Sequence, residues 1–427
     1  MDTVITGPVT ALPAFSERTN LLATNHSQRM NLNFDAKDIQ MRTLATIVFT
    51  TIFCFLGFAQ QEPTPAADIP GAWLGQVRNK TVAVVANPTS MSKDMHLVDR
   101  LVANGVTVKR VFAPEHGFRG DHAAGEHVSS DVDSKTGIPI VSLYGNHKKP
   151  TLEEVVDVDL VIFDIQDVGV RFYTYISTMT YVMEACAEAG VTFLVLDRPN
   201  PNGNFVDGPV LKSEFSSFVG LHPVPIAHGM TVGEYAKMVK GEGWIENAEK
   251  LSLLVSPCLF YEHDDTYSLP ITPSPNLPND ASIALYPSLC LFEGTPVSIG
   301  RGTDEPFQWI GAPWFPDQSE SFTPKSVPAA PHPKFENEVC YGVNVQSFGS
   351  NYLRSHGGIY LFWLIEAYNN YDQSEGPFFT PFFSKLAGTD ELQKQIEAGM
   401  TEEQIRASWQ PDLDAFRAIR SKYLLYN

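Results

Sequence analysis

The sequence predicts an α/β protein, with a Rossmann-like, doubly wound parallel sheet followed by a smaller α+β C-terminal domain. Short apolar runs rich in β-branched residues recur between residues 81 and 196, and helical patterns separate them. Continuous apolar strands that alternate with helices are typical of a parallel sheet covered on both faces. Beyond about residue 270, proline, serine and aromatic residues become dense. This change predicts a second domain.

The elements of the sheet follow from the apolar runs and their spacing. TVAVVA at 81–86 is the first predicted strand, and a helix over 97–103 connects it to the next strand. The same alternation predicts the elements that follow. The further strands span 107–112, 139–143, 160–163 and 192–196, and the further helices span 181–189 and 358–368, with two more after Asp390.

Chain length and composition agree with two packed domains. A chain of 427 residues is too long for one ordinary core. Its hydrophobic content of 43% and charged content of 19% are those of a globular protein. The predicted segments are an N-terminal extension that is disordered or misassigned (1–40), a signal peptide (41–59), a Rossmann-like domain (68–285) and a C-terminal auxiliary domain (286–427).

The segment 41–59 has the layout of a secretory signal peptide. One arginine precedes an apolar run, and the small residues Gly57 and Ala59 stand at positions −3 and −1 of a cleavage site. The run is too short to span a bilayer as a helix. We therefore expect an exported protein, periplasmic or secreted; the alternative is a membrane anchor that is retained after export.

The charge balance argues against two classes of partner. The chain has 49 acidic and 30 basic residues, a net charge of −19. Such a surface repels nucleic acid and anionic lipid, so we expect no nucleic-acid partner, and no membrane partner once the signal is cleaved. The cysteines beyond residue 60 are widely spaced without a C-x-x-C pair, which excludes zinc ribbons and redox motifs.

Polar and ionisable residues follow every predicted strand. In open parallel sheets, ligands bind outside the carboxyl ends of the strands. Some of these residues can be helix caps, turn formers or salt-bridge partners, Asp164 and Asp197 especially. Together they predict a site. They are Asn87 after the first strand, Glu115, His116 and Arg119 after the second, Tyr144 after the third, Asp164, Gln166 and Asp167 after the fourth, and Asp197, Arg198, Asn200 and Asn202 after the fifth.

The motifs of common cofactors and of covalent serine catalysis are absent from the sequence. The turn after the first strand, NPTSMSKD, has no glycine and cannot form a G-x-G-x-x-G dinucleotide loop. No G-x-x-x-x-G-K-[ST] phosphate loop occurs, and no serine has glycine at both −2 and +2. We expect no cofactor.

Acid/base hydrolysis by carboxylates and a metal site then remain. Glu115 stands beside the apolar Pro114 and Phe118, and such surroundings favour the protonated carboxyl of a proton donor. A metal site would use the ligand-type residues that follow, but their spacing matches no known pattern, so we expect no metal. Those residues are His116, Asp121, His122, Glu126 and His127.

Aromatic residues near these loops favour a sugar ligand. A pyranose ring has an apolar face and a polar rim, which suits flat side chains beside arginines and carboxylates. The alternative is core packing for the aromatics and salt bridges for the arginines. The aromatics are Phe172, Tyr173, Tyr175, Phe307, Trp309 and Trp314, and the arginines are Arg171, Arg198 and Arg301.

Several motifs resemble the exo-β-N-acetylmuramidase family, formerly a domain of unknown function. The resemblance runs from about Val82 to the carboxyl end, with the motifs in the right order. The motifs are PEHGFRG (114–120), AGE (124–126), SLYG (142–145), FDIQDVGVRFYTYI (163–176), LDRPNPNG (196–203), HGMTVGE (228–234), SPNLP (274–278) and LFEGTPVSIGRGT (291–303).

This resemblance implies an active cleft between the two domains and release of terminal N-acetylmuramic acid from the non-reducing end of peptidoglycan fragments, without a metal. It implies that Glu115 is catalytic and that muropeptides or disaccharides are the partners. The second catalytic group stays open among Glu126, Asp164, Asp167 and the acetamido oxygen of the substrate, with His116 beside them. The inverting or retaining outcome and the oligomeric state stay open as well.

The lactyl carboxylate of N-acetylmuramic acid calls for an arginine, which leaves Arg171, Arg198 and Arg301 as alternatives. The motifs also place Tyr173, His228 and Glu293 among the substrate-binding candidates. Two other functions remain in competition. One is a metal-dependent periplasmic hydrolase of amide or phosphoester bonds, and the other is a muropeptide-binding protein without catalysis.

Overall fold

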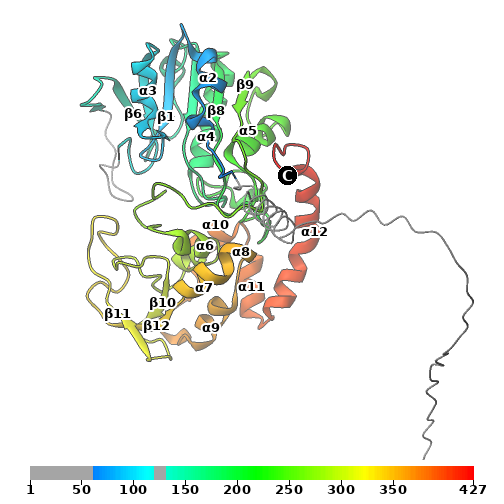
Figure 1. Ribbon diagram of the computed structural model, residues 1–427. Helices are drawn as coiled ribbons and strands as arrows, with labels where there is room; N and C mark the ends of the chain where they lie inside the picture. The colour runs from blue at the N-terminus through cyan, green and yellow to red at the C-terminus, as the bar shows by residue number, and fades with distance from the viewer. Residues whose placement is uncertain (1–60, 120–130) are drawn as a thin grey trace, which may run out of the picture. The chain divides into compact units, whose positions relative to one another are not determined.

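The computed structural model describes residues 61–119 and 131–427, and these form one compact unit (Figure 1). The predicted extension, the predicted signal peptide and Glu126 lie outside the described residues. The predicted domain boundary at 285 falls inside helix α6 (Asp280–Leu289) and stays a prediction. None of the helices in the described ranges is long and apolar enough to cross a bilayer.

A seven-stranded sheet dominates the first part of the described chain, in the order β5-β6-β4-β1-β7-β8-β9. Every neighbouring pair is parallel except β5 with β6. The six parallel strands thus have the classic Rossmann order, which reverses between β1 and β7. The predicted fold class is confirmed. The strands are β1 (Thr81–Ala86), β4 (Thr107–Ala113), β5 (Asp131–Val132), β6 (Pro139–Ser142), β7 (Leu160–Asp164), β8 (Thr192–Leu196) and β9 (Leu253–Ser256).

Helices cover both faces of this sheet, as alternation along β1 shows. Val82 and Val84 pack on the side of α2 and α3, while Ala83 and Val85 pack on the side of α4 and α5. All four side chains are fully buried, which explains the continuous apolar run in the sequence. The covering helices are α2 (Pro70–Val77), α3 (Leu97–Ala103), α4 (Tyr175–Ala189) and α5 (Val232–Gly241).

The second part of the chain combines helices with a small antiparallel sheet of order β10-β12-β11. The helix predicted from 358 begins only at Phe362, because Gly357 and Gly358 have φ values of 65° and 106°. The elements are β10 (Trp309–Ala312), β11 (Glu320–Phe322), β12 (Cys340–Asn344), α9 (Phe362–Asn370), α10 (Pro381–Ala387), α11 (Glu391–Glu397) and α12 (Glu402–Arg420).

Shorter elements connect these parts. A π-helical turn, η6, lies between two single-turn helices, α7 and α8. Their bounds are β2 (Met91–Ser92), β3 (Met95–His96), α7 (Gln346–Phe348), η6 (Gly349–Leu353) and α8 (Arg354–His356). The 3-10 turns are η1 (Ala66–Asp68), η2 (Leu152–Glu154), η3 (Ser213–Phe215), η4 (Ala248–Lys250), η5 (Cys290–Gly294) and η7 (Gln373–Glu375).

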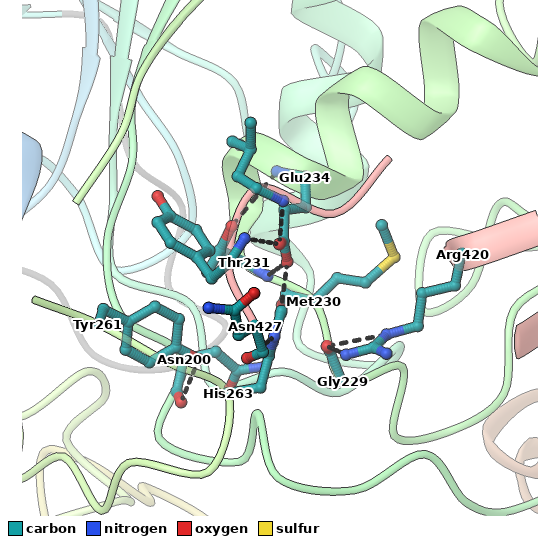
Figure 2. Close-up of polar contacts among 12 residues, drawn as sticks. Asn200, Gly229, Met230, Thr231, Glu234, Tyr261, His263, Arg420 and Asn427 are labelled. Atoms are coloured by element: carbon teal, nitrogen blue, oxygen red, sulfur yellow. Dashed lines mark hydrogen bonds and ion pairs between the residues drawn. The ribbon is translucent and has the colours of Figure 1, made fainter. Parts of the chain in front are cut away.

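The segment 421–427, which follows α12, is fastened to the Rossmann-like part by a buried carboxylate. Glu234 on α5 accepts a hydrogen bond from Leu425 N at 2.7 Å. The other oxygen of Glu234 lies 2.9 Å from His263 Nε2, and His263 N donates to Asn427 O at 2.9 Å (Figure 2). The tail therefore links the last helix to α5 and to the loop that carries His263.

Candidate active site

A cavity of about 210 Å3 lies where loops after β4 and β7 meet the second part of the chain. Glu115 and His116 follow β4, and Thr174 and Tyr175 stand at the start of α4. Both predicted domains thus contribute to one pocket beyond the carboxyl ends of parallel strands. The residues after 270 that line the cavity are Ser274, Asn276, Leu277, Tyr286, Glu293, Arg301, Phe307 and Phe382.

The Glu115 carboxylate faces this cavity and is held from the start of α4. Thr174 Oγ1 donates to Glu115 Oε2 at 3.1 Å, and Tyr175 Oη lies within 3.4 Å of the Glu115 carbonyl oxygen. Burial, together with the charge of Glu115, raises the pKa of Tyr144 to about 12. Tyr144 therefore stays protonated as a donor near Glu115. The half-buried carboxyl is oriented yet open to a ligand.

His116 adopts a strained backbone conformation on the cavity wall. Its φ is +72°, in the left-handed region that costs a side-chain-bearing residue about 1–3 kcal/mol. Burial lowers the pKa of its imidazole, so the ring is neutral near pH 7; the charge of Glu115 opposes this shift. Its Nδ1 atom is buried without a hydrogen-bond partner among the described residues. A neutral imidazole in the cavity can accept a proton.

Arg301 is the arginine that reaches the cavity. Its Nε donates to Glu293 Oε1 at 2.7 Å, and its Nη2 contacts the same oxygen. The guanidinium carbon lies 5.0 Å from the centre of the Phe307 ring, which also lines the cavity. A planar fork in this position suits a ligand carboxylate.

Arg171 and Arg198 make their hydrogen bonds away from the cavity. Arg171 is fully buried and donates to three backbone carbonyls, including Leu386 O at 2.9 Å. Arg198 Nε donates to Asp164 Oδ1 at 2.6 Å in a buried ion pair, and burial raises the pKa of Asp164. Neither arginine lines the cavity, and neither does Asp164.

Asp167 and His228 form a buried pair off the cavity wall. Asp167 Oδ2 accepts a hydrogen bond from Gly169 N at 2.7 Å and lies 3.9 Å from His228 Nε2. Burial raises the pKa of Asp167 to about 7 and lowers that of His228 to about 3. Asp167 Oδ1 and His228 Nε2 find no partner in the described part of the chain.

The other predicted strand-end residues hold loops together and do not line the cavity, except Tyr173. Tyr173 lines the cavity, and its hydroxyl donates to Pro273 O at 2.5 Å. Burial raises the pKa of Asp197 to about 6. The loop contacts are Asn87 Oδ1 with Thr89 N (2.9 Å), Arg119 Nε with Asp133 (2.9 Å), Gln166 Nε2 with Pro199 O (2.7 Å), Asp197 Oδ1 with Gly233 N (2.8 Å), Asn200 Nδ2 with Met230 O (2.9 Å) and Asn202 Nδ2 with Val168 O (2.8 Å).

The cavity also contains residues that the sequence did not single out for the site. Thr174 lies inside the FYTY stretch, so its motif was a usable signal. Tyr286 on α6 and Phe382 on α10 come from parts of the chain with no sequence signal for a site. Within the described ranges, no group of three or more metal-ligating side chains gathers.

Comparison with known proteins places the chain in a family. Residues 82–281 match the family description "Exo-beta-N-acetylmuramidase NamZ, N-terminal", and residues 284–426 match its C-terminal counterpart. The chain is 38% identical over 372 residues to the "Peptidoglycan beta-N-acetylmuramidase NamZ" of Bacillus subtilis (strain 168), which covers 82% of this chain and 88% of that protein.

Two solved structures, both of DUF1343 family proteins from Bacteroides fragilis NCTC 9343, are similar along most of the chain. One has a TM-score of 0.79 at 45% identity, and the other has 0.72 at 27% identity. Each comparison covers 86% of this chain and 99% of the solved chain. With both family descriptions matched in order over residues 82–426, the chain belongs to the exo-β-N-acetylmuramidase family.

Proposed function

We propose that this protein is an exo-acting glycoside hydrolase that releases terminal N-acetylmuramic acid from the non-reducing end of peptidoglycan fragments. The observation that carries the proposal is the joint presence of Glu115 and Arg301 in one small cavity. A carboxyl group serves as the proton donor, and a guanidinium binds the lactyl carboxylate that distinguishes this sugar. Family membership and the B. subtilis relative support the same activity.

The proposed proton donor is Glu115. Its carboxyl proton passes to the glycosidic oxygen as the bond from that oxygen to C1 of the muramic acid breaks. Water then adds at C1 and gives its proton to the group that acts as base, and the Glu115 carboxyl is protonated again before the next turnover. Thr174 holds the carboxyl group, and Tyr175 contacts the main-chain carbonyl of the same residue, so both the side chain and the backbone of Glu115 are held in place.

The candidates for the second catalytic group, which acts at C1, differ in whether they line the cavity. Asp164 and Asp167 do not line the cavity, so we do not propose either of these carboxylates as that group. Two of the expected groups are left as candidates for the reaction at C1. One is the neutral His116 imidazole, as a base for water, and the other is the acetamido oxygen of the substrate itself. Glu126 lies outside the described residues and stays a candidate.

Arg301 is the proposed binding residue for the lactyl carboxylate. Arg171 and Arg198 are bound to backbone carbonyls and to Asp164 respectively, so a ligand cannot reach either without breaking buried contacts. Arg301 shares its charge with Glu293, and a ligand carboxylate would share it further. A small enclosed pocket also suits one terminal sugar, in keeping with exo action.

We also propose export. The segment 41–59 has the features of a secretory signal, and peptidoglycan fragments arise outside the cytoplasmic membrane. Cell fractionation with cleavage-site mapping tests this proposal: a mature chain that begins at Gln60 supports it, and a full-length cytoplasmic protein contradicts it.

The activity is tested by incubating the protein with the disaccharide of N-acetylmuramic acid and N-acetylglucosamine and identifying the products by mass. The proposal expects both free sugars, with the same rate in the presence of a chelator. Activity lost to the chelator and restored by a divalent ion would favour the metal-dependent hydrolase. Binding of the disaccharide without release of sugar would favour a binding protein.

A further inference from the structure

A second cavity, of about 630 Å3, lies on the C-terminal part of the chain and shares no lining residue with the active-site cavity. We call it the aromatic groove. It lies between one side of α12, the loop around 205–207 and the turn that joins α8 to α9. Its lining includes Phe205, Tyr352, His356, Tyr360, Arg406 and Arg417.

One wall of the groove is built from stacked rings. Phe348, Tyr352 and His356 follow one another at a spacing of four residues along α7, η6 and α8. Tyr352 stacks on His356 with ring centres 4.2 Å apart and planes 6° apart, and on Phe348 at 5.2 Å and 21°. Tyr360 packs edge-on against Tyr352 at 6.1 Å. Both faces of the Tyr352 ring are therefore covered by neighbouring rings.

This wall is open to solvent. Tyr352 is 41% exposed, and His356 is exposed as well. Among the described rings, none stacks on the second face of His356, so that face is free of aromatic partners. The π-helical turn η6 carries Tyr352, and such turns frequently occur at functional sites. Pyranose rings pack on flat aromatic faces, and in this wall the outer face of His356 is the face that can take one.

Charged groups complement the rings around the groove. Arg417 is exposed and donates to Asp414 and to Val206 O, contacts at the surface that a ligand can replace at little cost. Arg406 is fixed more firmly by Asp207 and Ile359 O. The lining also contains the acidic residues Asp207, Glu402 and Glu403, so the groove presents hydrogen-bond donors beside acceptors.

Acceptors are present as well. Glu402 and Glu403 line the groove, and Glu402 already accepts a hydrogen bond from Leu361 N at 3.0 Å. Exposed Glu403 can accept from sugar hydroxyl and amide groups. The groove thus offers an aromatic face, hydrogen-bond donors and hydrogen-bond acceptors together, which suits the hydroxyl and amide groups of an N-acetylated sugar chain.

We propose that the aromatic groove is a second, non-catalytic binding site for the glycan strand of peptidoglycan. The choice of ligand rests on the proposed function. The active-site cavity has room for a terminal sugar, whereas the groove is about three times as large and holds a longer stretch. The enzyme would stay bound to the glycan strand through this site while the active site removes sugars from the end of the strand.

The test compares polymer with small substrate. Peptide-free glycan strands are sedimented with the protein, and release of N-acetylmuramic acid is measured from the strands and from a chromogenic muramoside. Tyr352→Ala removes the ring that supports His356 and should weaken retention on strands roughly three- to tenfold. Arg417→Glu, which leaves the ring wall intact, should do the same. Both variants should hydrolyse the chromogenic muramoside at the wild-type rate.

Matched controls lie outside the groove. Phe362→Ala removes an aromatic side chain that is 58% exposed, and Lys385→Glu makes the same charge change as Arg417→Glu at an exposed position. Neither control should alter retention. Retention of both groove variants at the wild-type level would overturn the proposal, and so would an equal loss on strands and on the small muramoside.

The proposed function can fail separately from this inference. A wild-type protein that releases no sugar from the chromogenic muramoside, yet sediments with strands through Tyr352 and Arg417, would reject the activity and keep the groove. A wild-type protein that hydrolyses the muramoside but is not retained on strands would reject the groove and keep the activity.

Discussion

The carboxylates after β4 and those after β7 and β8 occupy opposite environments, although all follow strands of one sheet. Glu115 faces a cavity and has a hydroxyl donor at 3.1 Å. Asp164 and Asp197 are fully buried, one in an ion pair with Arg198 and one accepting from the start of α5. Location at the carboxyl edge of a sheet therefore selects candidates for chemistry, but access to a cavity separates a reacting group from a structural one.

The same comparison explains the division of labour between the two parts of the chain. The Rossmann-like part supplies Glu115 and a dense hydrogen-bonded framework behind it. The second part supplies Arg301, Glu293 and Phe307, which complete the cavity. Substitution of a framework residue should therefore change stability, whereas substitution of a cavity residue should change activity.

The largest expected effect on stability comes from breaking the buried pair. Arg198→Met leaves the Asp164 carboxylate buried without its cation, which should lower the free energy of unfolding by about 3–5 kcal/mol. Urea denaturation measures this change. The double variant Arg198→Met with Asp164→Leu should recover most of the loss, because both charges are then removed.

The control for this change is Arg417→Met, which breaks an exposed ion pair and should cost no more than about 1 kcal/mol. Equal losses in Arg198→Met and Arg417→Met would show that burial of the first pair has no energetic consequence. The distinction between framework and surface would then fail for these residues.

The second largest effect is a pH dependence of the free energy of unfolding, which comes from Asp167. Burial raises the pKa of Asp167 to about 7, well above the ordinary value of an aspartate. The folded protein therefore holds a proton that the unfolded chain releases near pH 4, so this group makes the protein less stable as pH rises from about 4 to about 7. In Asp167→Asn the slope is absent, and the stability of the variant relative to wild type should rise across that window by up to about 4 kcal/mol.

Unfolding free energies measured at several pH values test the sign. A stability difference between Asp167→Asn and wild type that falls from pH 4 to pH 7 would contradict a buried, protonated Asp167. The matched variant Asp157→Asn alters a more exposed carboxyl paired with Arg110 and should show no rising difference.

The smallest effect concerns recognition. Arg301→Met should raise the KM for a muramoside about 10- to 100-fold, the range expected for loss of a charge-assisted hydrogen bond. The activity ratio between a muramoside and the matching glucosaminide, which lacks the lactyl group, should fall by the same factor. Arg301→Lys should retain part of the preference, since it keeps the charge and loses the fork. An unchanged ratio in Arg301→Met would exclude the lactyl contact.

The sequence predicts the bounds of some helices and strands correctly and misses others. β1, β8 and α3 have the predicted bounds, because continuous apolar runs or a helical pattern define them. β9 is an edge strand with Leu254 37% exposed, and its mixed burial gives no clean pattern. The helix predicted at 181–189 begins at Tyr175, since the buried aromatic start of α4 resembles a loop in composition.

The sequence predicted several residues of the cavity, but it could not tell which of the candidate arginines reaches it. Glu115, His116, Tyr173, Glu293 and Arg301 were all named from the sequence, and all line the cavity. The sequence could not separate Arg301 from Arg171, because the carbonyls that bind Arg171 come from segments as distant as Leu386. The contacts of Glu234 with residues 425 and 426 likewise depend on tertiary structure that no local pattern encodes.

The central claim is that Glu115 gives its proton to the oxygen that leaves. The most direct measurement compares Glu115→Gln with wild type on two muramosides, the natural disaccharide and an aryl muramoside whose leaving group needs no proton. We predict a loss of about 10²- to 10⁴-fold on the disaccharide and a far smaller loss on the aryl substrate, with an unchanged melting temperature. Equal losses on both substrates, or near-normal turnover of the disaccharide, would contradict the assignment.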